Sequence, residues 1–155
     1  MTFTSDDDLD ALDRIERSID VDASPDRVWA LVSVPGWWIT EGDLVPNEVV
    51  DEGDGVHRVT HPTYGSFRIA RVEARPPSYV AFRWLGGGAG ETEEGPDTLV
   101  ELFVDERPGG VTLRVVESGF TRGDGDRRRW LGHREENVTG WREVLDAARR
   151  RLASA

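Results

Sequence analysis

One apolar stripe along a long C-terminal helix constrains the fold of this chain more than any other feature. Apolar residues recur at spacings of seven, three, four, three and four, at Leu131, Val138, Trp141, Leu145, Ala148 and Leu152. This spacing predicts a continuous helix from about Asp126 to Leu152, with one face that must be buried. Gly140 interrupts the helix, and we expect it to mark a close approach to another element.

The residues before this helix supply the surface that buries it. Apolar and polar residues alternate over residues 15–22, which predicts a strand with one buried face. Ser24 and Pro25 mark the start of a short helix, and Pro35-Gly36 ends it. Short turns separate the later strands, which we expect at residues 56–60, 67–74, 79–85, 98–104 and 111–117. Strands joined in this way predict an antiparallel sheet with one packed face and one solvated face.

These elements predict an α+β fold in which a curved antiparallel sheet wraps around the long C-terminal helix, with two short helices after the first strand. The length of 155 residues fits one domain. We expect this domain to span residues 13–155. Residues 1–12 are rich in Asp and contain no basic residue, so we expect them to form a disordered acidic leader.

Charge and composition exclude several classes of partner and chemistry. Acidic residues outnumber basic ones by 30 to 19, and the net charge of −11 repels phosphate backbones, so we expect no nucleic acid partner. No apolar run is long enough to span a membrane, and the first residues lack the features of a signal peptide. We therefore expect a cytoplasmic protein that does not associate with membranes. The chain has no cysteine and no lysine, which excludes disulfides, thiolate metal sites and Schiff-base chemistry.

Four stretches of the sequence are similar to a known family. They are Ala23 to Leu31 with its Val-Trp pair, Gly36-Trp37-Trp38, Val72 to Trp84, and Glu117 to Phe120 together with Gly140-Trp141 and Leu145. In combination they resemble the START-like, or Bet v 1-like, helix-grip superfamily (SRPBCC), and within it the branch of the activator of heat-shock protein 90 ATPase. The resemblance covers about residues 14–152. It implies a helix-grip fold with a cavity between sheet and helix, and it allows a role as a stress-related co-chaperone.

A cavity of this kind would be lined by the inner face of the sheet and by the helix stripe. The side chains that we expect to bind a ligand there are Trp37, Trp38, Phe82, Trp84, Glu117, Trp130, His133, Arg134, Asn137 and Trp141. For the tryptophans, ordinary core packing is the alternative interpretation. An apolar cavity with a few converging polar groups is the usual form of a small-molecule site.

Arg134 is the most unusual of these residues, because the helix stripe places it on the buried side. We expect it to form an ion pair with Glu117, which continues the inward register of the last strand. The alternative is that both side chains are solvated at the rim of the cavity. His133 and Asn137, one helical turn apart, form a second polar pair beside the stripe.

The residues leave three functions open. The leading prediction is a non-catalytic protein that binds a small hydrophobic or amphipathic molecule in the cavity. The second is a co-chaperone-like module that binds a chaperone or another protein. The third is a cyclase or hydrolase of the same fold, with Glu117 and His133 as an acid–base pair. We expect no cofactor and no metal, because His57 and His61 lie on one strand without the further ligands that a compact site needs.

Overall fold

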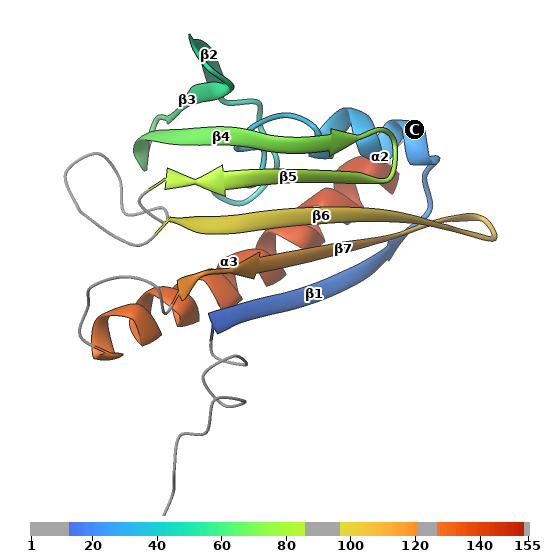
Figure 1. The fold of residues 1–155 in the computed structure, drawn as a ribbon. Helices are drawn as coiled ribbons and strands as arrows, with labels where there is room; N and C mark the ends of the chain where they lie inside the picture. The colour runs from blue at the N-terminus through green and yellow to red at the C-terminus, as the bar shows by residue number, and fades with distance from the viewer. Residues whose placement is uncertain (1–12, 86–96, 121–126, 154–155) are drawn as a thin grey trace, which may run out of the picture.

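A computed structural model describes residues 13–85, 97–120 and 127–153 of the chain. Its centre is an antiparallel sheet of seven strands in the order β1-β7-β6-β5-β4-β3-β2 (Figure 1). The strands are β1 (Arg14–Val21), β2 (Glu48–Gly53), β3 (Val56–His61), β4 (Gly65–Arg75), β5 (Tyr79–Trp84), β6 (Thr98–Arg107) and β7 (Gly110–Ser118). The expected antiparallel sheet is confirmed, and β2 is a strand that the sequence did not indicate.

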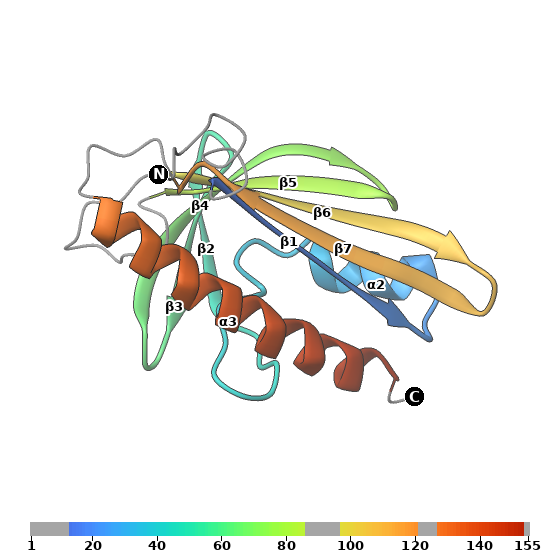
Figure 2. The ribbon, with the colours of Figure 1, turned by 90° about the horizontal axis from the view of Figure 1, so that it is seen from below.

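Two helices pack on one face of the sheet. The helix α3 (Arg127–Ala153) crosses this face and packs against β1, while α2 (Pro25–Val32) packs against β6 and β7 (Figure 2). The inward strand positions Val80, Phe82 and Leu102 are fully buried in the core. The expected α+β architecture, with a sheet wrapped around a long C-terminal helix, is thereby confirmed.

The chain between β1 and β2 forms one short helix and then a series of turns. Ser24 caps α2, because the backbone N–H of Arg27 donates to its Oγ at 3.2 Å. In place of a second short helix, turns span residues 34–39, where the N–H of Trp37 donates to Val34 and that of Ile39 to Gly36. This segment, residues 33–47, is called the connector below.

Gly36 fixes the position of the connector on the sheet. Its φ of +71° lies in the left-handed region, and a Cβ added there would come within 2.8 Å of the Val59 side chain on β3. Only glycine combines this backbone conformation with such a close approach. The two tryptophans that follow it are therefore held over the sheet.

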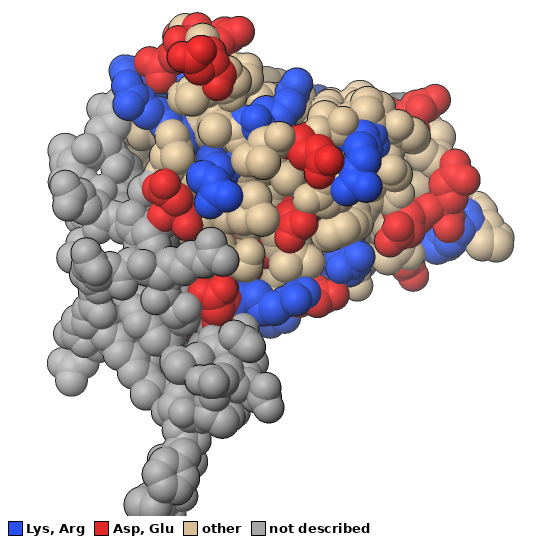
Figure 3. Space-filling view, viewed as in Figure 1, with Lys and Arg blue, Asp and Glu red and all other residues tan. Residues whose placement is uncertain are grey.

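The opposite face of the sheet is polar. Arginine and acidic side chains are interspersed across it (Figure 3). Glu16 on β1 illustrates this pattern, since it forms ion pairs with Arg14 at 2.6 Å and with Arg114 at 3.4 Å. The predicted solvated face is confirmed. The leader at residues 1–12 lies outside the described residues.

Candidate ligand-binding site

Glu117 on β7 is the buried polar centre of the interface between the sheet and α3. Its side chain is completely buried, because the inward register of β7 directs it toward the helix. The Oγ1 of Thr98 donates to Oε2 of Glu117 at 2.7 Å, and the Nε1 of Trp141 donates to Oε1 at 2.8 Å. The Nδ2 of Asn137 donates to both carboxylate oxygens, at 3.0 and 3.2 Å. Strands β6 and β7 and helix α3 are thus joined through one carboxyl group.

The carboxyl group of Glu117 is surrounded by neutral donors rather than by a cation. Burial raises the pKa of Glu117 above its ordinary value of 4.5, while the hydrogen bonds from Thr98, Trp141 and Asn137 act in the opposite direction. Burial is the larger of these effects. Glu117 is therefore easier to protonate in the folded protein than in the unfolded chain.

The expected ion pair between Arg134 and Glu117 is wrong. The Nη2 of Arg134 instead donates to the backbone carbonyl of Arg14 on β1 at 3.1 Å. Asn137 and Trp141 lie one turn apart on α3 and occupy the carboxyl group of Glu117. The long side chain of Arg134 reaches the edge strand β1, where a backbone carbonyl oxygen accepts a hydrogen bond from its guanidinium group.

Aromatic side chains form a cluster beside this hydrogen-bond network. Trp38 lies at its centre, with ring centroids 5.5 Å from Phe82, 5.5 Å from Trp84 and 5.8 Å from Trp141. Trp37 packs edge-on against Trp38 at 6.2 Å and against Trp141 at 6.3 Å. Edge-on and tilted contacts at these distances are the favourable arrangements of aromatic pairs.

Three indole groups of this cluster are not satisfied. Among the described residues, the Nε1 atoms of Trp37, Trp38 and Trp84 are sealed from solvent without a hydrogen-bond partner. An unsatisfied buried donor typically costs about 1–3 kcal/mol. Trp141 differs from these three, because its indole N–H donates to Glu117. The cluster therefore holds three indole donors that the described protein atoms leave unpaired.

A pocket of about 460 Å³ opens next to the cluster. Its walls come from the connector, from the turn between β3 and β4, from the start of β4, from the end of β5 and from the middle of α3. Five aromatic side chains line it, and these are Trp38, Tyr64, Phe67, Trp84 and Trp141. The remaining lining residues are Ile39, Thr40, Gly42, Glu136, Asn137, Thr139, Gly140, Glu143 and Val144. The size and the apolar walls are typical of a site for a small molecule.

The structure brings most of the predicted ligand-binding residues together at this pocket. Trp38, Trp84, Asn137 and Trp141 line it directly. Trp37 and Phe82 contact Trp38, and Glu117 lies behind Asn137 and Trp141. Arg134 lies against β1 instead, and the side chains of Trp130 and His133 lie outside the described part of the structure.

The pocket lies nearer to the connector than the sequence indicated. The inner face of the sheet was expected to line the cavity, but its inward positions Val100, Leu113 and Val115 are completely buried in the core and do not line the pocket. The expectation for Gly140 is also wrong, because no described atom lies within 4 Å of a Cβ added there. Gly140 faces the open pocket rather than the sheet, and its missing side chain adds to the pocket volume.

Several lining residues were missed by reasoning from the sequence. Tyr64 and Phe67 lie in a turn and at a strand start, which carry no periodic signal of a site. Glu136 and Glu143 are seven residues apart on α3 and could have been found by extending the face that contains Gly140. Thr98, which donates to Glu117, follows from the register only once β6 is paired with β7.

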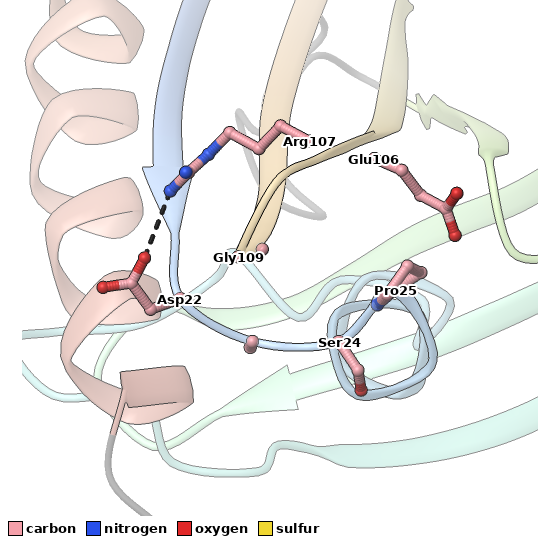
Figure 4. A pocket seen from close by; sticks show the side chains of 8 residues that line it. Asp22, Ser24, Pro25, Glu106, Arg107 and Gly109 are labelled. Carbon is pink, nitrogen blue, oxygen red and sulfur yellow. Dashed lines mark hydrogen bonds and ion pairs between the residues drawn. The ribbon is translucent and has the colours of Figure 1, made fainter.

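A second depression lies at the other end of the sheet and is a weaker candidate. It is formed where the β6–β7 turn meets the start of α2, and Figure 4 shows Arg107 directed toward Asp22 across it. Arg107 forms ion pairs with Asp22 at 3.2 Å and with Asp20 at 3.6 Å. Among the described residues that line the depression, Arg107 is the one cation and is already neutralised, and none of them is aromatic.

In the described part of the chain, no group of three or more His, Asp or Glu side chains is arranged to hold a metal ion. No helix in that part of the chain has the length and hydropathy needed to cross a membrane.

Comparison with known proteins gives matches in structure but not in sequence. No protein-family model matches the chain, and neither does the sequence of any curated protein compared with it. The fold superimposes on DynU16, a protein of the dynemicin biosynthetic locus, with a TM-score of 0.67 and 21% identity. This match covers 92% of the present chain and 48% of DynU16, so the chain spans about half the length of that protein.

A second match decides the fold. The Aha1 dimer from Colwellia psychrerythraea superimposes with a TM-score of 0.64 and 14% identity, over 91% of this chain and 96% of that one. The fold is the START-like helix-grip fold. CalU16 from Micromonospora echinospora has the same helix-grip fold, with a TM-score of 0.57 and 20% identity, over 91% of this chain and 76% of its own. The expected resemblance to the helix-grip superfamily and to Aha1-like proteins is thereby confirmed at the level of the fold.

Proposed function

We propose that this helix-grip protein binds a small, largely hydrophobic molecule in the pocket between α3, the connector and the sheet. The observation that carries the proposal is the pocket of about 460 Å³ with five aromatic side chains in its walls. The unsatisfied indole groups of Trp38 and Trp84 in the same walls support it. A ligand that rearranges these side chains can lower the free-energy cost of their unpaired indole N–H groups. A protein packed only for stability gains nothing from leaving these groups unpaired.

We propose that binding is not followed by catalysis. An acid–base catalyst must reach the proton that it transfers. Glu117 is completely buried and does not line the pocket, and its carboxyl oxygens already accept hydrogen bonds from three side chains. The cyclase or hydrolase alternative would require this network to open. The co-chaperone alternative would place protein binding on the polar outer face of the sheet or on the tryptophans of the connector.

The test is a titration of labelled protein with a library of small hydrophobic compounds, followed by amide chemical shifts. Ligands in the pocket should move the amides of Phe67, Trp84 and the segment 136–144. Shifts confined to the outer face, or no shifts with any compound, would contradict the proposal.

A pair of glycine variants gives a matched control for the site. Gly140→Leu should fill the pocket, because the space beside Gly140 is open, and should weaken binding at least tenfold. Gly132→Leu makes the same change on an open part of the same helix that does not line the pocket. It should leave binding unchanged, while both variants should retain the fold.

A further inference from the structure

The charges at the pocket point to the class of ligand, an inference that rests on the proposed function. Both charged side chains among the described lining residues are carboxylates, Glu136 and Glu143 on α3. Both are exposed, and they are separated by seven residues, or two helical turns. No arginine or histidine occurs among the described residues that line the pocket. A carboxylate or phosphate ligand would therefore meet like charges and find no cationic partner there.

The neighbouring charged residues that the structure describes do not reverse the negative charge at the pocket opening. Gly42 in the pocket wall lies between Glu41 and Asp43 of the connector. Asp43 forms an ion pair with Arg150 at 3.5 Å, while Glu41 accepts a hydrogen bond from the hydroxyl of Thr63 at 2.9 Å. Among the described residues, the opening therefore keeps an excess of negative charge, and the whole chain has a net charge of −11.

The aromatic walls of the pocket suit a ligand that carries a positive charge. The faces of tryptophan and tyrosine rings attract organic cations, and aromatic cages for ammonium groups combine such rings with nearby carboxylates. Tyr64 stands at the opening with half of its surface exposed. The His61 ring stacks on it at a centroid distance of 4.6 Å, which holds the tyrosine ring in place. Trp38, Phe67 and Trp84 supply an apolar interior for the rest of the molecule.

We infer that the ligand is an amphipathic organic cation, with an aromatic or aliphatic body among the tryptophans and an amine near Glu136 and Glu143. The solvent-exposed carboxylates of Glu136 and Glu143 and the partly exposed ring of Tyr64 each attract the amine of the ligand only modestly. Together they should favour a cation over a neutral molecule of the same shape by about tenfold at low salt. The preference should shrink as salt is added, because exposed charges are screened.

A matched series of probes tests this inference. 2-Naphthylmethylammonium, 2-naphthylmethanol and 2-naphthoate share one aromatic body and differ in charge. Their dissociation constants are measured at pH 8 and low salt from the amide shifts of the pocket. We expect the ammonium compound to bind about tenfold more tightly than the alcohol, and the carboxylate to bind most weakly.

Two double variants separate the local charges from the net charge. Glu136→Gln with Glu143→Gln should reduce the preference for the ammonium compound over the alcohol to about twofold. Glu48→Gln with Glu135→Gln removes the same charge from exposed positions outside the pocket and should preserve the preference.

The outcomes distinguish this inference from the function on which it rests. If the alcohol binds in the pocket but the ammonium compound is not preferred, the inference is wrong and the proposed function stands. The same holds if the preference survives removal of Glu136 and Glu143. If none of the three probes moves the pocket amides, both the proposed function and the inference are contradicted.

Discussion

Replacing Glu117 should reveal how a single buried carboxyl group joins the helix to the sheet. In Glu117→Met, the donors of Trp141, Thr98 and Asn137 lose their acceptor. Trp141 is 3% exposed and Thr98 is completely buried, so water cannot replace the lost acceptor for these two. Each buried unsatisfied donor costs about 1–3 kcal/mol, and burying a thioether in place of a carboxyl group offsets part of this cost. We therefore expect the free energy of unfolding to fall by about 2–4 kcal/mol.

Glu117→Gln is the matched variant, because it keeps the shape and most of the hydrogen bonds. Its carbonyl oxygen can accept from Trp141 and Asn137, and its NH₂ can donate to the hydroxyl oxygen of Thr98. We therefore expect the free energy of unfolding to fall by less than about 1 kcal/mol below pH 4.5, where the raised pKa keeps more than half of the wild-type side chains protonated in the folded protein. Denaturant unfolding monitored by tryptophan fluorescence and circular dichroism measures both variants.

The pH dependence of this comparison isolates the titration of Glu117. Its pKa is raised in the folded protein, so above pH 4.5 the folded state holds a proton that the unfolded state has lost. The contribution of Glu117 to stability is therefore complete below pH 4.5 and declines as the pH rises toward the folded pKa. The limiting slope is about 1.4 kcal/mol per pH unit. Glu117→Gln lacks this decline, so its stability relative to the wild type should rise with pH.

Two results would refute this reasoning. A constant free-energy difference between wild type and Glu117→Gln from pH 4 to pH 8 would mean that Glu117 titrates alike in both states. A loss below about 1 kcal/mol for Glu117→Met would mean that the three donors find other acceptors, and that the network does not hold α3 to the sheet.

Three further predictions concern other parts of the molecule. Gly36→Ala should cost at least about 1–3 kcal/mol in denaturant unfolding, since it places a Cβ against Val59 at a positive φ, and Gly42→Ala, also at positive φ but in open space, should cost less. Burial and the hydrogen bond to Glu101 raise the pKa of Tyr79 to about 12, so absorbance at high pH should show a late tyrosine ionisation, and Tyr79→Phe should remove this late step. Deleting residues 1–12 should leave the melting temperature within about one degree, because they contain too few apolar residues to offset the entropy of ordering them; a fall of several degrees would show that the leader docks on the domain.

The sequence by itself determined the architecture of this protein. The alternation over residues 15–22 and the stripe that includes Trp141 and Leu145 are periodic, and periodicity follows directly from strand and helix geometry. Each apolar face must be buried, and a sheet followed by one long helix has few ways to bury both. The inward direction of Glu117 followed from the same register, whereas the choice between burial and solvation at the rim did not.

Only the tertiary structure decided which side chains meet and where space remains. Asn137 and Trp141, rather than Arg134, reach Glu117, because the position of α3 over the sheet sets which helical turn faces β7. The pocket combines Tyr64, Glu143 and Gly140 from separate elements, and no spacing along the chain connects them. Local periodicity specifies which face of an element is buried, whereas contacts between elements depend on their relative translation and rotation, which the packing of the whole core sets.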